Sequence, residues 1–120
     1  MGKITNTSRL LKSYIGLINA YKYPGIKKLV CINSPLMINP HLLFNGIKEF
    51  SGEKMFLIYG SNDPSFRMIK IYSELESERI NFIHVNGADH NFTACLDFFI
   101  ELPGVLFFED ELTYKGAKVR

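Results

Sequence analysis

Three short apolar segments recur along the chain, each followed by a polar break and then by a segment with helical spacing. They are KKLVCIN at residues 27–33, KMFLIYG at residues 54–60 and INFIHVN at residues 80–86. Runs of this length, rich in β-branched and aromatic residues, are typical of β-strands. Because the runs are nearly continuous rather than alternating, they indicate strands covered on both faces, as in parallel sheets.

Segments with helical spacing separate these strands. They cover residues 8–21, 41–50, 65–78 and 92–102. Parallel strands joined through helices require right-handed crossovers. We therefore predict an α/β fold in one domain, residues 1–120, with three α/β/α layers around a short, mainly parallel sheet of three strands. Pro103 and Gly104 are expected to end the last helix, and VLFFED at residues 105–110 is either a fourth strand or a tail packed on the sheet.

Composition and charge exclude several classes of protein. The net charge is +2 and the basic residues are spread along the chain, which does not fit a nucleic-acid-binding surface. No run approaches the roughly 18 apolar residues of a membrane span. Cys31 and Cys95 lie in apolar surroundings, so we expect buried free thiols and a cytoplasmic protein. Together with the three scattered histidines they show no metal-ligand spacing, so neither a metal nor a cofactor is expected.

Polar residues follow each predicted strand at its carboxyl end, where ligands bind in parallel sheets. They are Asn33-Ser34-Pro35, Ser61-Asn62-Asp63 and Asp89-His90. Asp63 and His90 are separated by one helix and one strand, so their loops should be neighbours. We predict that these two side chains lie close together. Ser34-Pro35 is a common turn start, and no chemistry is assigned to it.

Each of these residues also has a purely structural interpretation. Asp63 before Pro64 is a favourable helix cap. His90 is compatible with an ordinary loop position, and Asp89 is expected to cap the last helix together with Asn91. His84 alternates with Phe82 within a strand, which favours a packed histidine without a chemical role.

Two motifs resemble the C-terminal half of the α/β-hydrolase family. KMFLIYGSNDPSF at residues 54–66 is a strand ending in Gly-x-x-Asp-Pro, and INFIHVNGADHNF at residues 80–92 ends in Gly-Ala-Asp-His-Asn-Phe. AYKYPGIKKLVCINSP is similar to the family segment after the nucleophile helix, and the resemblance extends from about Ser8 to Phe108. It implies carboxylic-ester or thioester hydrolase ancestry. In a Ser-Asp-His triad Asp63 would orient His90, and His90 would be the general base.

The family nucleophile has no counterpart in this register. The family motif is Gly-x-Ser-x-Gly, but Ser8 and Lys12 stand where its glycines belong, and Leu10 stands at the nucleophile. Ser8 is two residues out of register and is better explained as a helix N-cap. The preceding strand and the oxyanion-hole loop are also not expected, since only MGKITNT lies upstream. We therefore expect either a hydrolase remnant or a fragment of a longer hydrolase, inactive alone in both cases.

Two other functions remain open from the sequence. A half sheet leaves an apolar edge strand at Lys28–Asn33, and the helix Leu10–Tyr21 has an apolar surface wider than one face. Both features predict a homodimer formed through one of these elements, and a non-catalytic oligomerising domain is the alternative to the hydrolase. A flavodoxin-like or receiver-like ligand-binding domain is a weaker third possibility, because no glycine-rich phosphate loop is present.

Overall fold

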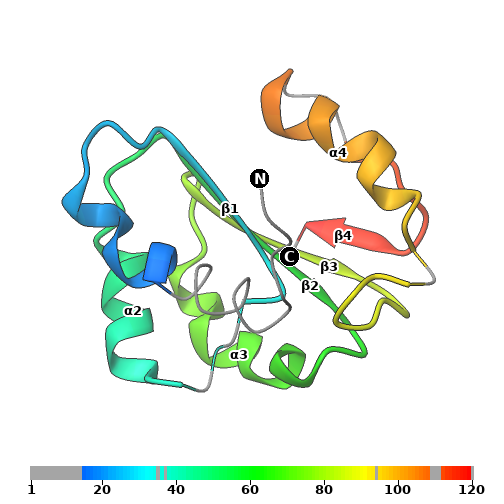
Figure 1. The fold of residues 1–120 in the computed structure, drawn as a ribbon, viewed down its shortest axis with the longest axis horizontal. Coiled ribbons are helices and arrows are strands. Elements are labelled where there is room, and N and C mark those ends of the chain that lie inside the picture. Colours follow the sequence, from blue (N-terminus) through cyan, green and yellow to red (C-terminus); the bar gives the residue numbers. More distant parts are fainter. Residues whose placement is uncertain (1–14, 35, 37, 94, 109–111, 120) are drawn as a thin grey trace, which may run out of the picture.

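The computed structural model describes residues 15–34, 36, 38–93, 95–108 and 112–119 (Figure 1). Within them four strands form one sheet in the order β1-β2-β3-β4. The strands are β1 (Lys28–Ile32), β2 (Lys54–Gly60), β3 (Ile80–Val85) and β4 (Ala117–Val119). The first three are parallel, and β4 pairs antiparallel with β3. The predicted α/β class and mainly parallel sheet are confirmed.

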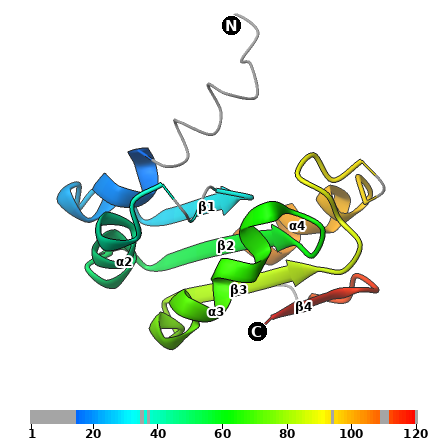
Figure 2. The ribbon, with the colours of Figure 1, turned by 90° about the horizontal axis from the view of Figure 1, so that it is seen from below.

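Helices cover both faces of the sheet, giving the three predicted layers (Figures 1 and 2). The elements α2 and α3 lie on one face, and α4 lies on the other. In chain order they are a helical stretch at residues 15–19 continued by η1 (Ala20–Lys22), α2 (Pro40–Lys48), η2 (Pro64–Met68), α3 (Ile69–Tyr72), η3 (Ser73–Leu75) and α4 (Phe98–Phe107). The remainder of the predicted helix 8–21 lies outside the described residues, as does Ser8.

The central strand β2 divides the hydrophobic core in two. Met55, Leu57 and Tyr59 belong to the cluster under α2 and α3, whereas Phe56 and Ile58 belong to the cluster under α4. All five are buried, because successive side chains of a strand point to opposite faces and both faces are covered. Each such side chain contributes roughly 1.5–3 kcal/mol when fully buried. The prediction of strands covered on both faces is therefore confirmed for β2.

The same prediction is wrong for β1, which lies at the edge of the sheet. Val30 and Ile32 are 36% and 37% exposed, while Cys31 between them is buried. Val30 pairs with Phe56 and Ile32 with Ile58, so both exposed side chains lie on the face that α4 covers. The cover given by α4 does not extend fully over this edge. Cys31 and Cys95 are both buried and take part in no disulfide, as predicted.

The continuous helix predicted over residues 65–78 is wrong. The segment divides into η2, α3 and η3. Asp63 caps the first of these by accepting from the Ser65 amide at 2.8 Å. The Ser73 hydroxyl donates to the carbonyl oxygen of Lys70 at 2.7 Å, and such local bonds compete with the regular helical pattern.

The predicted end of the last helix at Pro103 and Gly104 is also wrong. The helix α4 begins only at Phe98 and continues through Pro103 to Phe107. Phe98 and Leu102 are buried against the sheet, and this packing offsets the amide donor that proline lacks. Residues 105–107 of VLFFED are therefore helical rather than a strand, and the fourth strand is β4. Among the described residues, no helix is long and apolar enough to cross a membrane.

Candidate active site

The loops that follow β2 and β3 are in close contact at the carboxyl edge of the sheet. The Ser61 amide donates to the Val85 carbonyl oxygen at 3.0 Å, and the Asn62 amide donates to that of Ala88 at 2.9 Å. A Cβ atom placed on Gly60 would lie only 2.2 Å from the carbonyl oxygen of Ala88. Glycine is therefore required at position 60 by the close approach of backbone from the neighbouring loop.

Side chains join the same two loops. The Ser61 hydroxyl accepts from the Gly87 amide at 2.7 Å, and the Asn62 side-chain amide donates to the Gly87 carbonyl oxygen at 3.2 Å. Gly87 has a φ of +82°, which only glycine adopts without cost. The turn that carries Asp63 and the loop that carries His90 are thus fixed to each other by several bonds.

Asp63 and His90 form a direct side-chain contact. His90 Nδ1 lies 2.5 Å from Asp63 Oδ1, so the predicted proximity of the two side chains is confirmed. The Asp63 side chain is 1% exposed, whereas that of His90 is 34% exposed. The second carboxylate oxygen of Asp63 accepts from the Ser65 amide, so the capping interpretation of Asp63 holds alongside the contact. Their roles as acid and base stay a prediction.

The contact has a chemical consequence for the imidazole. An ionised carboxylate only accepts hydrogen bonds, so Nδ1 must carry a proton to bond Asp63. In the neutral ring this leaves a lone pair on Nε2, the atom that takes a proton in general base catalysis. Within the described ranges, Asp63 is the side chain that bonds the His90 ring. A buried acceptor behind a partly exposed imidazole is therefore geometrically suited to orient a base.

The neighbours of the pair have structural roles. Asp89 Oδ1 accepts from the amides of Asn91 and Thr93 at 3.1 and 2.9 Å, and the bond from Thr93 is the main cause of the lowered pKa of Asp89. Asp89 therefore caps the turn after His90, and its predicted role as cap of the last helix is wrong. Position 97 is the N-cap of α4.

The packed interpretation of His84 is confirmed, because its ring meets that of Phe66 edge-on with centroids 5.8 Å apart.

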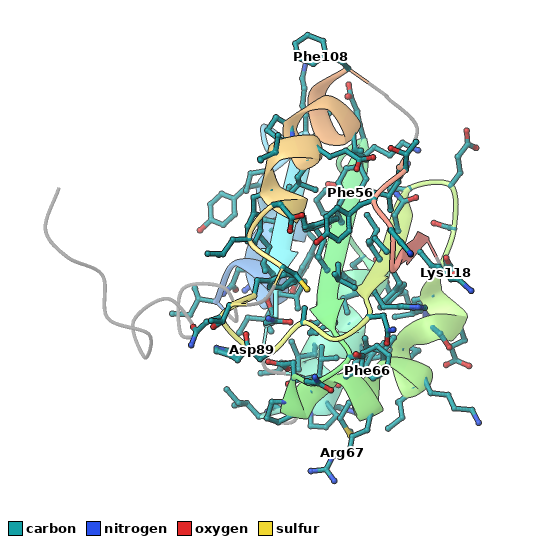
Figure 3. The ribbon with its side chains drawn as sticks, turned by 90° about the vertical axis from the view of Figure 1, so that its right-hand side faces the viewer. Phe56, Phe66, Arg67, Asp89, Phe108 and Lys118 are labelled. Atoms are coloured by element: carbon teal, nitrogen blue, oxygen red, sulfur yellow. The ribbon has the colours of Figure 1, made fainter. Side chains whose placement is uncertain are left out.

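In Figure 3 Phe66 and Arg67 lie at the same end of the molecule as Asp89, and Phe108 lies at the far end. The site therefore occupies one end of the sheet.

The loop after β1 also reaches this site, and the sequence interpretation assigned it no role. Asn33 is 1% exposed, and its side-chain amide donates to the carbonyl oxygens of Asp89 and His90 at 3.2 and 2.7 Å. Its Oδ1 accepts from the Gly60 amide at 3.0 Å. The available signal was its position, since Asn33 directly follows a predicted strand as Asp63 and His90 do.

Two buried tyrosines fix the next part of that loop. The Tyr59 hydroxyl donates to the Ser34 carbonyl oxygen and the Tyr72 hydroxyl donates to that of Leu36, both at 3.0 Å. Burial raises the pKa of Tyr59 well above its ordinary value, and the electrostatic influence of the neighbouring Cys31 and Asp63 side chains raises it further. Tyr59 therefore remains a neutral donor beside the buried carboxylate.

A hollow of about 270 Å³ lies beside the Asp63 turn. Its lining residues are Ser61, Asn62, Asp63, Pro64, Phe66 and Arg67. Two larger hollows, of about 480 and 510 Å³, lie at the opposite edge of the sheet and between α2 and α3. His90 lines none of these three hollows. Among the residues that the structure describes, no group of three or more His, Cys, Asp or Glu is placed to hold a metal ion.

Comparison with known proteins supports the fold. Neither a protein-family model nor a curated protein sequence matches the chain. A solved structure of an alpha-beta serine hydrolase homologue from Coxiella burnetii is similar, with a TM-score of 0.57 and 18% sequence identity. The match covers 87% of this chain and 45% of that one, so the chain spans less than half the length of the similar protein. At this identity the similarity shows an α/β-hydrolase-like fold and nothing further.

Proposed function

We propose that this chain carries the acid and the base of a hydrolase-type site, of esterase or thioesterase ancestry. Asp63 is the acid that orients the imidazole, and His90 is the general base. The observation that carries this proposal is the 2.5 Å contact between a buried carboxylate and a partly exposed histidine at the carboxyl edge of the sheet. The similar fold of a serine hydrolase homologue is consistent with it.

We further propose that the chain does not hydrolyse esters by itself. In the family register Leu10, which has no nucleophilic atom, stands at the nucleophile, and the position lies outside the described residues. Donors of an oxyanion hole are worth about 3 kcal/mol each, and the resemblance supplies no segment for them. A base without a nucleophile and an oxyanion hole gives little acceleration.

Two measurements test the acid–base pair and the lack of ester hydrolysis separately. Nitrogen NMR of the His90 ring tests the pair: the proton should reside on Nδ1 in the natural chain and should distribute between both nitrogens in Asp63→Asn. An unchanged distribution in that variant would contradict the pair. Turnover of a short-chain aryl ester tests inactivity, and no rate above that of buffer is expected. A rate abolished by His90→Ala would contradict inactivity while supporting the base.

The exposed edge of β1 favours a second function, a non-catalytic domain that self-associates. Val30 and Ile32 present apolar side chains beside an edge that pairs with no other described strand. On α4, the same side of the sheet, Ile100 is 83% exposed. An obligate dimer would bury roughly 2,000 Å² or more. The other predicted contact, the helix Leu10–Tyr21, is described only from residue 15.

Sedimentation at micromolar concentration tests this second function. A dimer is expected, and Ile32→Lys should convert it to a folded monomer. Glu76→Lys is the matched control, since it changes a partly exposed charge at the end of η3, on neither β1 nor α4, and should leave the dimer intact. A natural chain that sediments as a folded monomer would contradict self-association and leave the acid–base proposal untouched.

A further inference from the structure

Asn33 holds an unusual backbone conformation directly after β1. Its φ is +52°, and Phe92 is the other described non-glycine residue with a positive φ. Asparagine tolerates this left-handed conformation better than most residues, but glycine would adopt it at no cost. The backbone amide of Asn33 donates to the Ile58 carbonyl oxygen at 2.8 Å, which continues the pairing of β1 with β2. The side chain is thereby directed across the ends of β2 and β3.

Every hydrogen-bonding group of the Asn33 amide has a partner of the right kind. Its oxygen accepts from the Gly60 amide, and its nitrogen donates to two carbonyl oxygens, those of Asp89 and His90. Because a carbonyl oxygen cannot donate, the reversed orientation of the amide would lose all three bonds. The side chain is 99% shielded from solvent, so water cannot replace these partners.

These bonds connect the backbone on both sides of the acid–base contact. Gly60 ends the strand that leads into the Asp63 turn, and the carbonyl oxygen of His90 belongs to the base itself. The bond to His90, at 2.7 Å, is the shortest of the three and restrains the residue that carries the imidazole. The orientation of a side chain follows the position of its backbone, so this bond bears on how Nδ1 meets Asp63.

We propose that Asn33 is a positioning residue for the Asp63–His90 pair. It holds the His90 backbone against the end of β2, so that Nδ1 is directed at the buried carboxylate and Nε2 stays available as a base. This inference rests on the proposed function of the pair. Asn33 itself donates to backbone and does not contact the reacting atoms.

The variant Asn33→Gly isolates the side chain, because glycine keeps the positive φ while removing all three amide bonds. In the full chain we expect the His90 proton to distribute between Nδ1 and Nε2, and its exchange with water to become roughly tenfold faster or more. The unfolding transition should remain cooperative. Asn62→Ala is the matched control, since it removes one exposed amide bond to Gly87 between the same two loops and should leave the His90 signals unchanged.

Two further variants make every outcome decisive. Asp63→Asn shows how the His90 ring signals look when the pair is broken. If Asp63→Asn leaves these signals unchanged, the proposed function fails. If Asp63→Asn changes them and Asn33→Gly does not, only the positioning role of Asn33 is overturned. Should Asn33→Gly not fold, Asn33→Asp decides, because it keeps the size of the side chain but replaces the two donated bonds with repulsion between oxygens. A folded Asn33→Asp chain with natural His90 signals would overturn the proposal.

Discussion

Replacing Gly60 by alanine would force apart the two loops that hold the acid and the histidine. The added Cβ would lie 2.2 Å from the carbonyl oxygen of Ala88, 2.6 Å from its carbonyl carbon and 2.8 Å from its Cβ. Ordinary contact requires about 3.4 Å or more, so backbone must move by about 1 Å. Overpacking of this kind costs about 1–3 kcal/mol, and losing the bond from the Asn62 amide to Ala88 adds roughly 1 kcal/mol. We expect the free energy of unfolding to fall by about 2–4 kcal/mol.

Urea unfolding followed by circular dichroism measures this change. With a slope of about 1–3 kcal/mol per molar urea, the midpoint of Gly60→Ala should fall by roughly 0.7–4 M. The matched control is Gly16→Ala, because residue 16 is helical and an added Cβ there meets nothing within 4 Å. Alanine is the better helix former, so this control should raise the free energy of unfolding by up to about 1 kcal/mol.

The two glycine variants should therefore shift stability in opposite directions. A Gly60→Ala midpoint equal to or above that of the natural chain would refute the close packing of the loops. The 2.5 Å contact between Asp63 and His90 would then lose its structural basis, since both side chains are carried by those loops.

Three further predictions concern the C-terminal half of the chain. The Tyr114 hydroxyl donates to Asp97 at 2.6 Å, which raises the pKa of Tyr114 to about 12. The contribution of this bond to stability is complete below pH 10 and is lost as pH rises through 12. In Asp97→Asn the Tyr114 pKa should return toward 10, as measured by absorbance titration. The pKa of Asp89 is lowered from 3.8, so its stabilising contribution is present above pH 3.8 and is lost as the pH falls through its pKa in the folded chain. The amide resonance of residue 93 should therefore shift only below pH 3.8. Pro103→Ala should raise the free energy of unfolding by about 1–2 kcal/mol, because it restores a helical donor at an exposed position, and no gain would indicate that α4 ends before Pro103.

The sequence was sufficient to predict the parallel strands and the meeting of Asp63 with His90. Both follow from local patterns: apolar runs identify the strands, and the carboxyl ends of adjacent parallel strands lie at one edge of the sheet. The errors occurred where tertiary packing overrides local preference. The helix α4 contains Pro103 because Phe98 and Leu102 are buried on the sheet, and β4 is only three residues long, too short for a recognisable pattern.

Sequence patterns did not predict the role of Asn33, for a different reason. Its bonds to the Asp89 and His90 carbonyl oxygens join residues 56 and 57 positions apart. Periodicity specifies which face of an element is buried, but it does not specify which loop atoms meet across the end of a sheet. Asparagine after a strand is also common in ordinary turns, so its residue type alone does not distinguish a positioning residue from a turn residue.

The contrast between β1 and β2 also shows that sequence patterns do not specify tertiary position, and this contrast bears on function. Their apolar sequences are alike, yet β2 is buried on both faces while β1 is half exposed at the edge. Natural edge strands usually carry charges or irregularities that prevent further pairing. Here Lys28 provides such a charge at the start of β1, but Val30 and Ile32 present a continuous apolar surface beside it. An exposed apolar edge of this kind favours association. We propose that the associating surface lies on β1, the strand leading directly to Asn33. A partner bound at that edge would contact the strand that leads into Asn33, whose own side chain is buried beneath the neighbouring loops.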